Sequence, residues 1–329
     1  MTTSTSTTTL TAHDEHRLVH FPVALFATVM GMAGLTLAWM KAPALIGVPE
    51  LVGEILRWLT SALFLFLLST YGLKLLRHPG AVLAEQAHPV KQNFFPAISI
   101  GLLLLSSAWL TTAPGVARLA WVLATALHLW FTLKIMRGWL FHDQVNILHA
   151  NPAWFIPVVG NILVPIAGAR LAPVDLNWFF FSVGLVFWLV LLTIILYRLF
   201  FHESLPARLM PTLFILIAPP AVGFIAYVAL TGTLNTFGRI LYFVALFFTL
   251  LMTSHARAFL RLPFSISAWA TSFPMAAITI ASLEMAALTG QAFFTTLGGT
   301  LLLITSTLIL MLVIRTLAAA RAGQICVPE

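Results

Sequence analysis

Long apolar runs recur from one end of the chain to the other and are separated by short clusters of charged and turn-forming residues. Each run has about 19 to 25 residues, which matches the ~30 Å hydrocarbon core of a bilayer. A β-barrel would show short alternating segments instead. The pattern therefore predicts an all-α polytopic membrane protein with ten transmembrane helices. These helices are expected near 20–40, 53–75, 93–112, 115–137, 153–171, 177–200, 208–231, 236–258, 264–287 and 292–315.

Composition supports the membrane class and excludes several others. Of the 329 residues, 60% are hydrophobic and only 8% are charged, too few to cover the surface of a soluble domain. The cations are scattered at the ends of apolar runs, which argues against nucleic-acid binding. Cys326 is the only cysteine, so no intrachain disulfide can form. We expect a disordered cytoplasmic tail at 1–19, a channel domain at 20–317 and a short cytoplasmic tail at 318–329.

The distribution of Lys and Arg predicts the orientation of the helices. Twelve of the 17 lie in the terminal tails or in the loops after even-numbered helices, and five lie on the other side. By the positive-inside rule, both termini and the even-numbered loops are expected in the cytoplasm. The five residues on the other side are Lys41, Arg57, Arg118, Arg170 and Arg239.

Prolines separate the helices into two kinds. The even-numbered helices contain none, whereas every odd-numbered helix contains at least one. Proline inside a helix removes a backbone hydrogen bond and bends the axis, and a freed carbonyl in lipid needs a partner or a water-filled cavity. We therefore expect five helical hairpins whose odd helices form a kinked inner ring around a central pore. The prolines of the odd helices are Pro22, Pro96, Pro157, Pro165, Pro211, Pro219, Pro220 and Pro274.

The stretch "AWATSFPMAAITIASLE" (268–284) places a bulky residue at the predicted midplane. Counting ~1.5 Å per residue puts the midplane about 10 residues into each odd helix. Most of the odd helices carry Gly or Pro at that depth, for example Gly31 and Pro165, while helix 9 carries Phe273 directly before Pro274. Phe273 is therefore predicted to plug the pore.

Five segments resemble one known family in order and spacing. "HFPVALFATVMGMAGL", "NFFPAISIGLLLL", "HANPAWFIPVVGNILVPIAG", "LFILIAPPAVGFIAY" and "WATSFPMAAITIA" are similar to the tellurite-resistance/dicarboxylate transporter family, which includes bacterial TehA-type proteins and plant guard-cell slow anion channels. The resemblance implies five hairpins, a homotrimer with one pore per subunit, and occlusion by a helix 9 phenylalanine, here Phe273. The family's helix 1 often has a glycine beside the gate, and the matching position here is Ala27.

Other polar residues are weaker candidates. The candidate pore-lining residues are Ala27, Gly31, Pro96, Ser99, Ser106, Pro157, Pro165, Pro219, Pro220, Pro274 and Thr279. Glu284 is a candidate for the outer mouth or a proton site, although an interfacial carboxylate is the favoured interpretation. His128 is expected to bond to a neighbouring helix. His142 and His149 lack a third ligand, so no metal site is predicted.

We expect an anion channel in the inner membrane of a bacterium, with small anions and membrane lipid as partners and no cofactor. No hydrolase triad, phosphate loop or metalloenzyme motif is present, and an enzyme is not expected. With no Lys or Arg at the midplane of the odd helices, attraction for anions is weak and favours rapid passage. The alternatives are a secondary transporter of malate, sulfite or tellurite, and a non-transporting scaffold, which the kinked ring disfavours.

The charge distribution makes a direct prediction about topology. Reporter fusions after Arg77 and Arg208 should report a cytoplasmic location, and a fusion after Arg118 should report the outside, because positive loops stay in the cytoplasm. Paired phosphatase and fluorescent-protein fusions at each position provide the measurement. A periplasmic signal after Arg208 would contradict the ten-helix arrangement.

Overall fold

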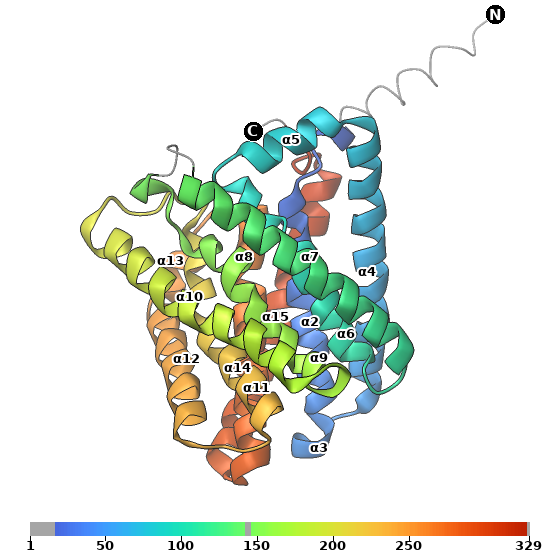
Figure 1. Cartoon of the computed structure of the whole chain (residues 1–329), viewed down its shortest axis with the longest axis vertical. Coiled ribbons are helices and arrows are strands. Elements are labelled where there is room, and N and C mark those ends of the chain that lie inside the picture. The colour runs from blue at the N-terminus through green and yellow to red at the C-terminus, as the bar shows by residue number, and fades with distance from the viewer. Residues whose placement is uncertain (1–16, 142–145, 328–329) are drawn as a thin grey trace, which may run out of the picture.

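The protein is described by a computed structural model that covers residues 17–141 and 146–327. Within these ranges the chain is helical and contains no strand. Five long helices form one set: α4 (Glu50–Arg77), α7 (Pro114–Phe141), α10 (Val174–Phe201), α12 (Thr236–Ser254) and α15 (Ala292–Arg321). The short helices α3 (Pro43–Ile46) and α5 (Pro79–Ala87) lie at opposite ends of the bundle (Figure 1), while η3 (Ile147–His149) and α13 (Ala256–Leu260) lie between longer elements along the chain.

The other set consists of five segments in which 3-10 and α-helical pieces alternate. Their elements are η1 (Val23–Leu25) with α2 (Phe26–Lys41); η2 (Lys91–Phe94) with α6 (Ala97–Trp109); η4 (Pro152–Trp154), α8 (Phe155–Val159), η5 (Gly160–Leu163) and α9 (Val164–Leu171); η6 (Met210–Ile217) with α11 (Ala218–Thr231); and η7 (Ile266–Thr271) with α14 (Ser272–Thr289). These correspond to the odd-numbered helices of the prediction.

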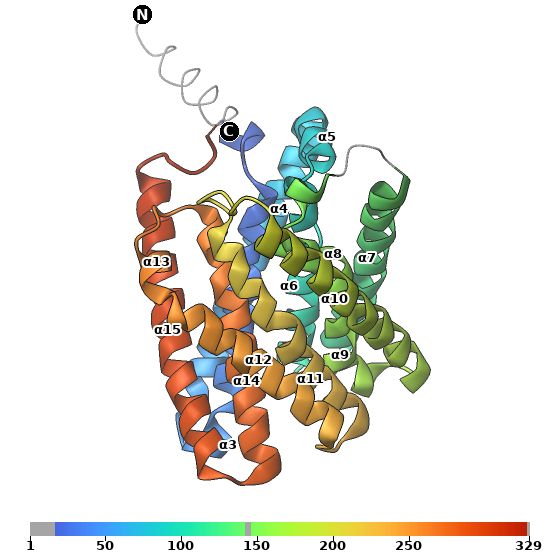
Figure 2. The same cartoon turned by 90° about the vertical axis from the view of Figure 1, so that its left-hand side faces the viewer.

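Burial confirms the division into an inner and an outer set. The apolar windows of four inner segments are 72%, 89%, 72% and 78% buried, whereas those of the five outer helices are only 28% to 39% buried. In the remaining inner helix, α6, nine of 13 residues are buried. Figures 1 and 2 show the outer helices at the periphery of the bundle with the inner segments between them. The outer helices therefore shield the inner ones from lipid.

Nine helices in the described ranges are long and apolar enough to cross a membrane, and the tenth predicted span is represented by η2 and α6. α6 has only 13 residues, too few to cross alone by the usual length criterion. However, the two ends of the described chain lie together, and the Arg17 guanidinium donates to the Ala320 carbonyl at 3.5 Å. A chain that begins and ends on the same side crosses an even number of times, so α6 supplies the tenth crossing.

The inner prolines do not bend continuous α-helices as the sequence suggested. Each one is the N-cap or one of the first three residues of a helical element: Pro96 caps α6, Pro165 is the second residue of α9 and Pro274 is the third of α14. The first N–H groups of a helix have no partner within that helix, so proline loses little there. The kinks are therefore restarts of the helix: Pro22 and Pro211 stand at the start of 3-10 stretches, and the other prolines stand at the start of α-helical pieces.

An Asn-Pro pair begins the inner segment that runs from η4 to α9. The side chain of Asn151 caps η4 by accepting a hydrogen bond from the Ala153 N–H at 2.9 Å, and Pro152 follows at the first position of that helix. This is the arrangement expected for an Asn-Pro pair at a helix start.

Buried hydrogen bonds connect the inner segments to the outer helices. The Thr132 hydroxyl of α7 donates to the Pro157 carbonyl at 2.7 Å, and the Trp121 indole donates to the Val164 carbonyl at 2.9 Å. On α15, the Thr305 hydroxyl shares a hydrogen bond of 3.0 Å with Thr279. These bonds satisfy polar groups of the inner segments that lipid could not.

A close approach of outer helix α10 to the inner segment yields a stability prediction. A Cβ added at Gly184 would lie 2.7 Å from the backbone nitrogen of Ile162. Gly184→Ala should therefore destabilise the fold by ~1–3 kcal/mol through overpacking. The measurement is thermal unfolding of the purified protein in detergent.

The matched control is Gly72→Ala on outer helix α4, where an added Cβ meets nothing within 4 Å. Alanine favours a helix by up to ~1 kcal/mol over glycine, so this variant should be as stable as the parent or slightly more stable. Equal melting temperatures for the two variants would refute the close approach.

Candidate functional site

The five inner segments meet at one small internal cavity, here called the inner cavity. Its volume is about 40 Å³, and all its lining side chains are apolar. Every inner segment contributes to the lining, and no outer helix does. The lining residues are Met30 from α2; Ile100 from α6; Phe155, Ile156, Val159, Gly160, Ile162 and Leu163 from α8 and η5; Ile215, Ala218, Pro219 and Val222 from η6 and α11; and Phe273 from α14.

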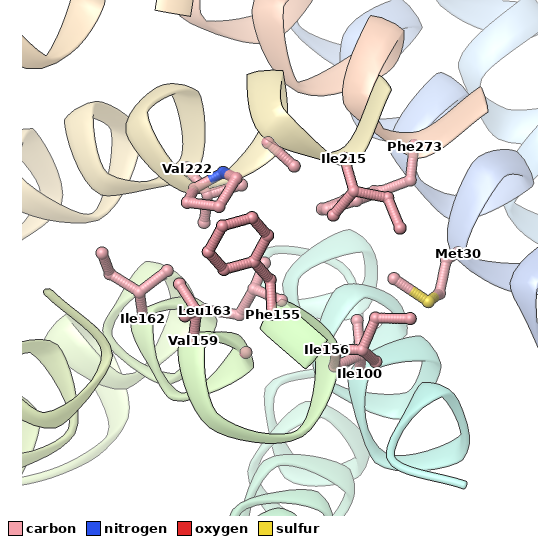
Figure 3. Close-up of a pocket in the computed structure, with 13 residues that line it drawn as sticks. Met30, Ile100, Phe155, Ile156, Val159, Ile162, Leu163, Ile215, Val222 and Phe273 are labelled. Atoms are coloured by element: carbon pink, nitrogen blue, oxygen red, sulfur yellow. The ribbon is translucent and has the colours of Figure 1, made fainter. Parts of the chain in front are cut away.

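Two aromatic rings from different segments border this cavity. Figure 3 shows the ring of Phe155 in the middle of the lining residues, with Phe273 and Met30 extending from other helices. Phe155 is 2% exposed and Phe273 is 7% exposed, so neither ring reaches solvent. The inner cavity is only slightly larger than a single water molecule, so side chains fill most of the space between the five segments.

Glycines of α2 allow α14, the helix that carries Phe273, to pack closely. A Cβ added at Gly34 would lie 3.3 Å from Cδ2 of Phe273 and 2.7 Å from Cβ of Ala276. One added at Gly31 would lie 2.6 Å from Cβ of Ser272. The glycine next to the Phe273 ring is therefore Gly34. Ala27, which was matched to that position from the sequence, packs instead against a separate apolar cluster.

The structure brings together only part of the predicted pore lining. Phe273 and Pro219 both line the inner cavity. The hydroxyls of three predicted residues are engaged elsewhere: Ser99 with His128 of α7 at 2.9 Å, Ser106 with the Ala117 carbonyl at 2.8 Å, and Thr279 with Thr305 of α15. The other predicted positions that do not line the inner cavity are Ala27, Gly31, Pro96, Pro157, Pro165, Pro220 and Pro274.

Sequence reasoning overlooked Phe155, Met30 and Ile100, which do line the inner cavity. Phe155 lies within "NPAWFIPVVGN", between Pro152 and Pro157. Only Pro157 of this stretch was predicted to line the pore. A signal was available, because Phe155 follows the Asn-Pro helix start as the first residue of α8. A bulky residue near a proline was also the feature that identified Phe273.

A buried polar cluster lies directly behind the wall of the inner cavity. His128 bonds across to Ser99, as expected from the sequence. One turn further along α7, Thr132 accepts a hydrogen bond from the Asn161 amide at 2.9 Å. A Cβ added at cavity-lining Gly160 would lie 2.6 Å from the His128 ring. The cluster thus joins α6, α7 and η5 without placing a polar group in the cavity.

At the end of the bundle opposite the termini, Glu284 forms an ion pair with Lys41. The two side chains are 19% and 28% exposed, so the pair is partly accessible to water. Lys41 ends α2 and Glu284 lies near the end of α14, both inner segments. The carboxylate therefore neutralises a cation beside the inner ring.

A larger cavity of about 310 Å³ lies at the end that carries the termini. Its lining includes Lys74, which is 1% exposed and bonds to Glu85 at 3.0 Å and to the Phe21 carbonyl at 2.8 Å. Cys326 of the C-terminal segment also lines it, and burial raises the pKa of its thiol against the opposing effects of Arg17 and Lys74. The buried cation is thus already paired within the protein.

No metal centre is found where the structure describes the chain, since no three His, Cys, Asp or Glu side chains there could hold an ion together. His149 accepts a hydrogen bond from the Asn146 N–H at 3.3 Å. His142, its suggested partner, lies outside the described residues.

Comparisons with known proteins find relatives that align with most of this chain. The S-type anion channel SLAH2 of Arabidopsis thaliana is 29% identical over 277 residues, which cover 81% of this chain and 53% of the relative. The tellurite resistance protein TehA homolog of Haemophilus influenzae is 27% identical, with 78% of this chain and 79% of the relative covered. An uncharacterized transporter of Methanocaldococcus jannaschii is 26% identical, with coverage of 78% and 82%.

The chain spans about half the length of the plant channels SLAH2 and SLAH3, since 53% and 44% of them are covered. A family model described as "SLAC1: Voltage-dependent anion channel" matches residues 20–317. This range contains all five inner segments and nearly all of the five outer helices. The chain therefore belongs to the SLAC1 family of voltage-dependent anion channels.

Proposed function

We propose that this protein is a channel for small anions such as chloride or nitrate, and that it is closed at the inner cavity by Phe273 together with Phe155. The observation that carries the proposal is the convergence of all five inner segments on one narrow apolar cavity bordered by these two rings. Related proteins named S-type anion channels support the choice of anions. The family is one of channels and transporters, and the proposal includes no catalytic role.

The chemistry of the inner cavity supports gating by exclusion of water. None of the lining residues can form an ion pair or donate a side-chain hydrogen bond. Moving an anion from water into such a site is strongly unfavourable, and narrow hydrophobic constrictions close pores by dewetting. Opening then requires displacement of the rings, which would expose backbone groups at the helix restarts to the passing ion.

The absence of a deep cation among the lining residues supports a channel more than a tight-binding carrier. A positive charge at the constriction would hold the anion, whereas conduction needs binding that is weak enough for release. Exposed basic residues such as Arg170, at the end of α9, and Arg208, in the loop after α10, lie outside the inner cavity, where they attract anions from bulk water.

We further propose that the protein is a homotrimer in the inner membrane of a bacterium, with both termini in the cytoplasm. The location of both described chain ends on one side of the bundle supports the last point. The excess of Lys and Arg on that side supports its assignment to the cytoplasm. The trimer rests on the family resemblance.

A secondary transporter of a small anion is the second candidate. It is favoured by the partly buried Glu284 beside the inner ring, because a carboxylate in a membrane protein can couple transport to protons. The ion pair with Lys41 argues for a structural role instead. Reversal potentials of the protein in planar bilayers at different pH gradients distinguish the two functions.

We expect the reversal potential to follow the anion gradient alone and to be unchanged by a pH gradient. Glu284→Gln should leave both the conductance and its pH dependence nearly unchanged, because the carboxylate pairs with Lys41 and does not line the inner cavity. A reversal potential that shifts with pH in the parent and not in this variant would establish coupled transport.

The closed inner cavity predicts the effect of removing each ring. Phe273→Ala should conduct constitutively, because a methyl group cannot fill the space that the phenyl ring occupies. Phe155→Ala should also raise the conductance, since its ring borders the same cavity from the opposite segment. Each substitution is expected to cost ~3–5 kcal/mol of packing energy. The measurement is anion current in planar bilayers at equal protein density.

Phe224→Ala is the matched control for these variants. Phe224 is a fully buried ring on the inner helix α11, but it packs against Tyr242 of outer helix α12 and does not line the inner cavity. It should lose similar packing energy without opening the path. Folded Phe273→Ala protein that is as silent as the parent would contradict the proposed gate.

A further inference from the structure

A second apolar cavity lies outside the inner ring and is here called the side cavity. It lies between the outer surface and α14, which carries the proposed gate Phe273 and is called the gate helix below. It has a volume of about 240 Å³ and lies between η6, α13, α14 and α15. Its walls include Phe214 and Phe259, whose rings meet edge to face at 4.9 Å, and Met275 of the gate helix. This volume exceeds that of ~150 Å³ apolar cavities that hold benzene-sized molecules.

The depth of the side cavity matches one leaflet of a bilayer. Its lining residues on α15 extend from Ile304 to Arg315. Eleven residues of α-helix rise ~16 Å, about half of the ~30 Å hydrocarbon core. An acyl chain that entered beside Arg315 would therefore reach the bilayer midplane at Ile304.

The end of the side cavity next to the lipid headgroups is positively charged. Arg315 lines it, and Arg257 and Arg261 lie on or directly after α13, which forms another wall. All three side chains are exposed, and in the described part of the chain none of their guanidinium groups makes a hydrogen bond or ion pair. The sequence from 204 to 328 contains one acid, Glu284, which pairs with Lys41 at the opposite end.

The opening of the side cavity also faces the membrane. Leu260 of α13 lines it and is 65% exposed, and Ile304 of α15 is 48% exposed. Large apolar side chains of a membrane-spanning helix are exposed where they contact lipid. A long apolar cavity of one leaflet's depth, open to lipid and ending at unpaired arginines, matches a molecule with an acyl chain and an anionic head.

We propose that the side cavity binds one anionic phospholipid of the leaflet on the terminal side, with an acyl chain against Met275 and Ile304 and the phosphate next to Arg315. A bound chain would contact the gate helix directly, because Thr271 and Met275 line the cavity on either side of Phe273 in sequence. The contact is reinforced by the Thr305 hydroxyl of α15, which donates to the Met275 carbonyl at 3.3 Å.

The test is native mass spectrometry of the full-length protein in detergent, titrated separately with phosphatidylglycerol, phosphatidylcholine and oleate. We expect phosphatidylglycerol to bind more tightly than phosphatidylcholine. Arg315→Gln should weaken phosphatidylglycerol binding about fivefold, the factor that corresponds to one arginine near an anionic headgroup. Phosphatidylcholine binding should not change in this variant.

Two further variants distinguish the contribution of the arginine charge from that of the cavity volume. Ala256→Phe fills the side cavity from α13 and should abolish phosphatidylglycerol binding while the three arginines remain. Ile304→Trp fills the side cavity from α15 and should also abolish phosphatidylglycerol binding. This variant is used in place of Ala256→Phe if Ala256→Phe fails to fold. Arg239→Gln, an exposed arginine at the start of α12 on the opposite side, is the matched charge control and should bind as the parent does.

Equal affinities for phosphatidylglycerol and phosphatidylcholine, or equal effects of Arg315→Gln and Arg239→Gln, would overturn the proposal. Binding of oleate without phosphatidylglycerol would overturn it too, since the ligand would then be a free fatty acid. The assay measures binding and no current, so its outcome is independent of the proposed gate.

Discussion

The requirement that backbone polar groups find partners inside the protein governs this structure. A transmembrane segment interrupted by prolines and 3-10 stretches leaves carbonyls that lipid cannot satisfy. Here the long outer helices donate to carbonyls of these segments or next to them: Thr132 to the Pro157 carbonyl, Trp121 to the Val164 carbonyl and Lys74 to the Phe21 carbonyl. The irregular inner segments are stable because continuous helices surround them and face the lipid in their place.

Hydrogen bonds to the outer helices also explain why the inner cavity is lined by apolar side chains. Polar side chains of the inner segments turn outward to meet the outer helices, as Ser99 does with His128 and Thr279 with Thr305. The inward positions are left to apolar side chains, so the inner cavity contains no charged or hydroxyl group. An apolar constriction is a simple barrier to ions, and in this fold it results from satisfying the backbone elsewhere.

Close packing at glycine then brings the Phe273 ring into position beside α2. Gly34 allows α2 to approach the ring of Phe273, and Gly184 allows α10 to approach the backbone of η5. The segment that carries Phe273 also lines the side cavity, through Thr271 of η7 and Met275 of α14. Phe273 therefore lies in the segment that lines both the inner cavity and the side cavity.

The sequence by itself determined the all-helical membrane fold, the alternation of inner and outer helices, and Phe273 as a cavity-lining residue, because hydrophobicity, prolines and charge are properties of positions along the chain. It did not determine which side chains face the centre: Phe155 was overlooked, Ala27 was chosen where Gly34 lies beside the ring, and Ser99, Ser106 and Thr279 face outer helices.

The direction in which a side chain faces depends on how its helix is rotated about its own axis. A 3-10 stretch has 3.0 residues per turn rather than 3.6, so each restart at a proline changes the register of the residues that follow it. Only the packing of the five segments against one another and against the outer helices decides that rotation.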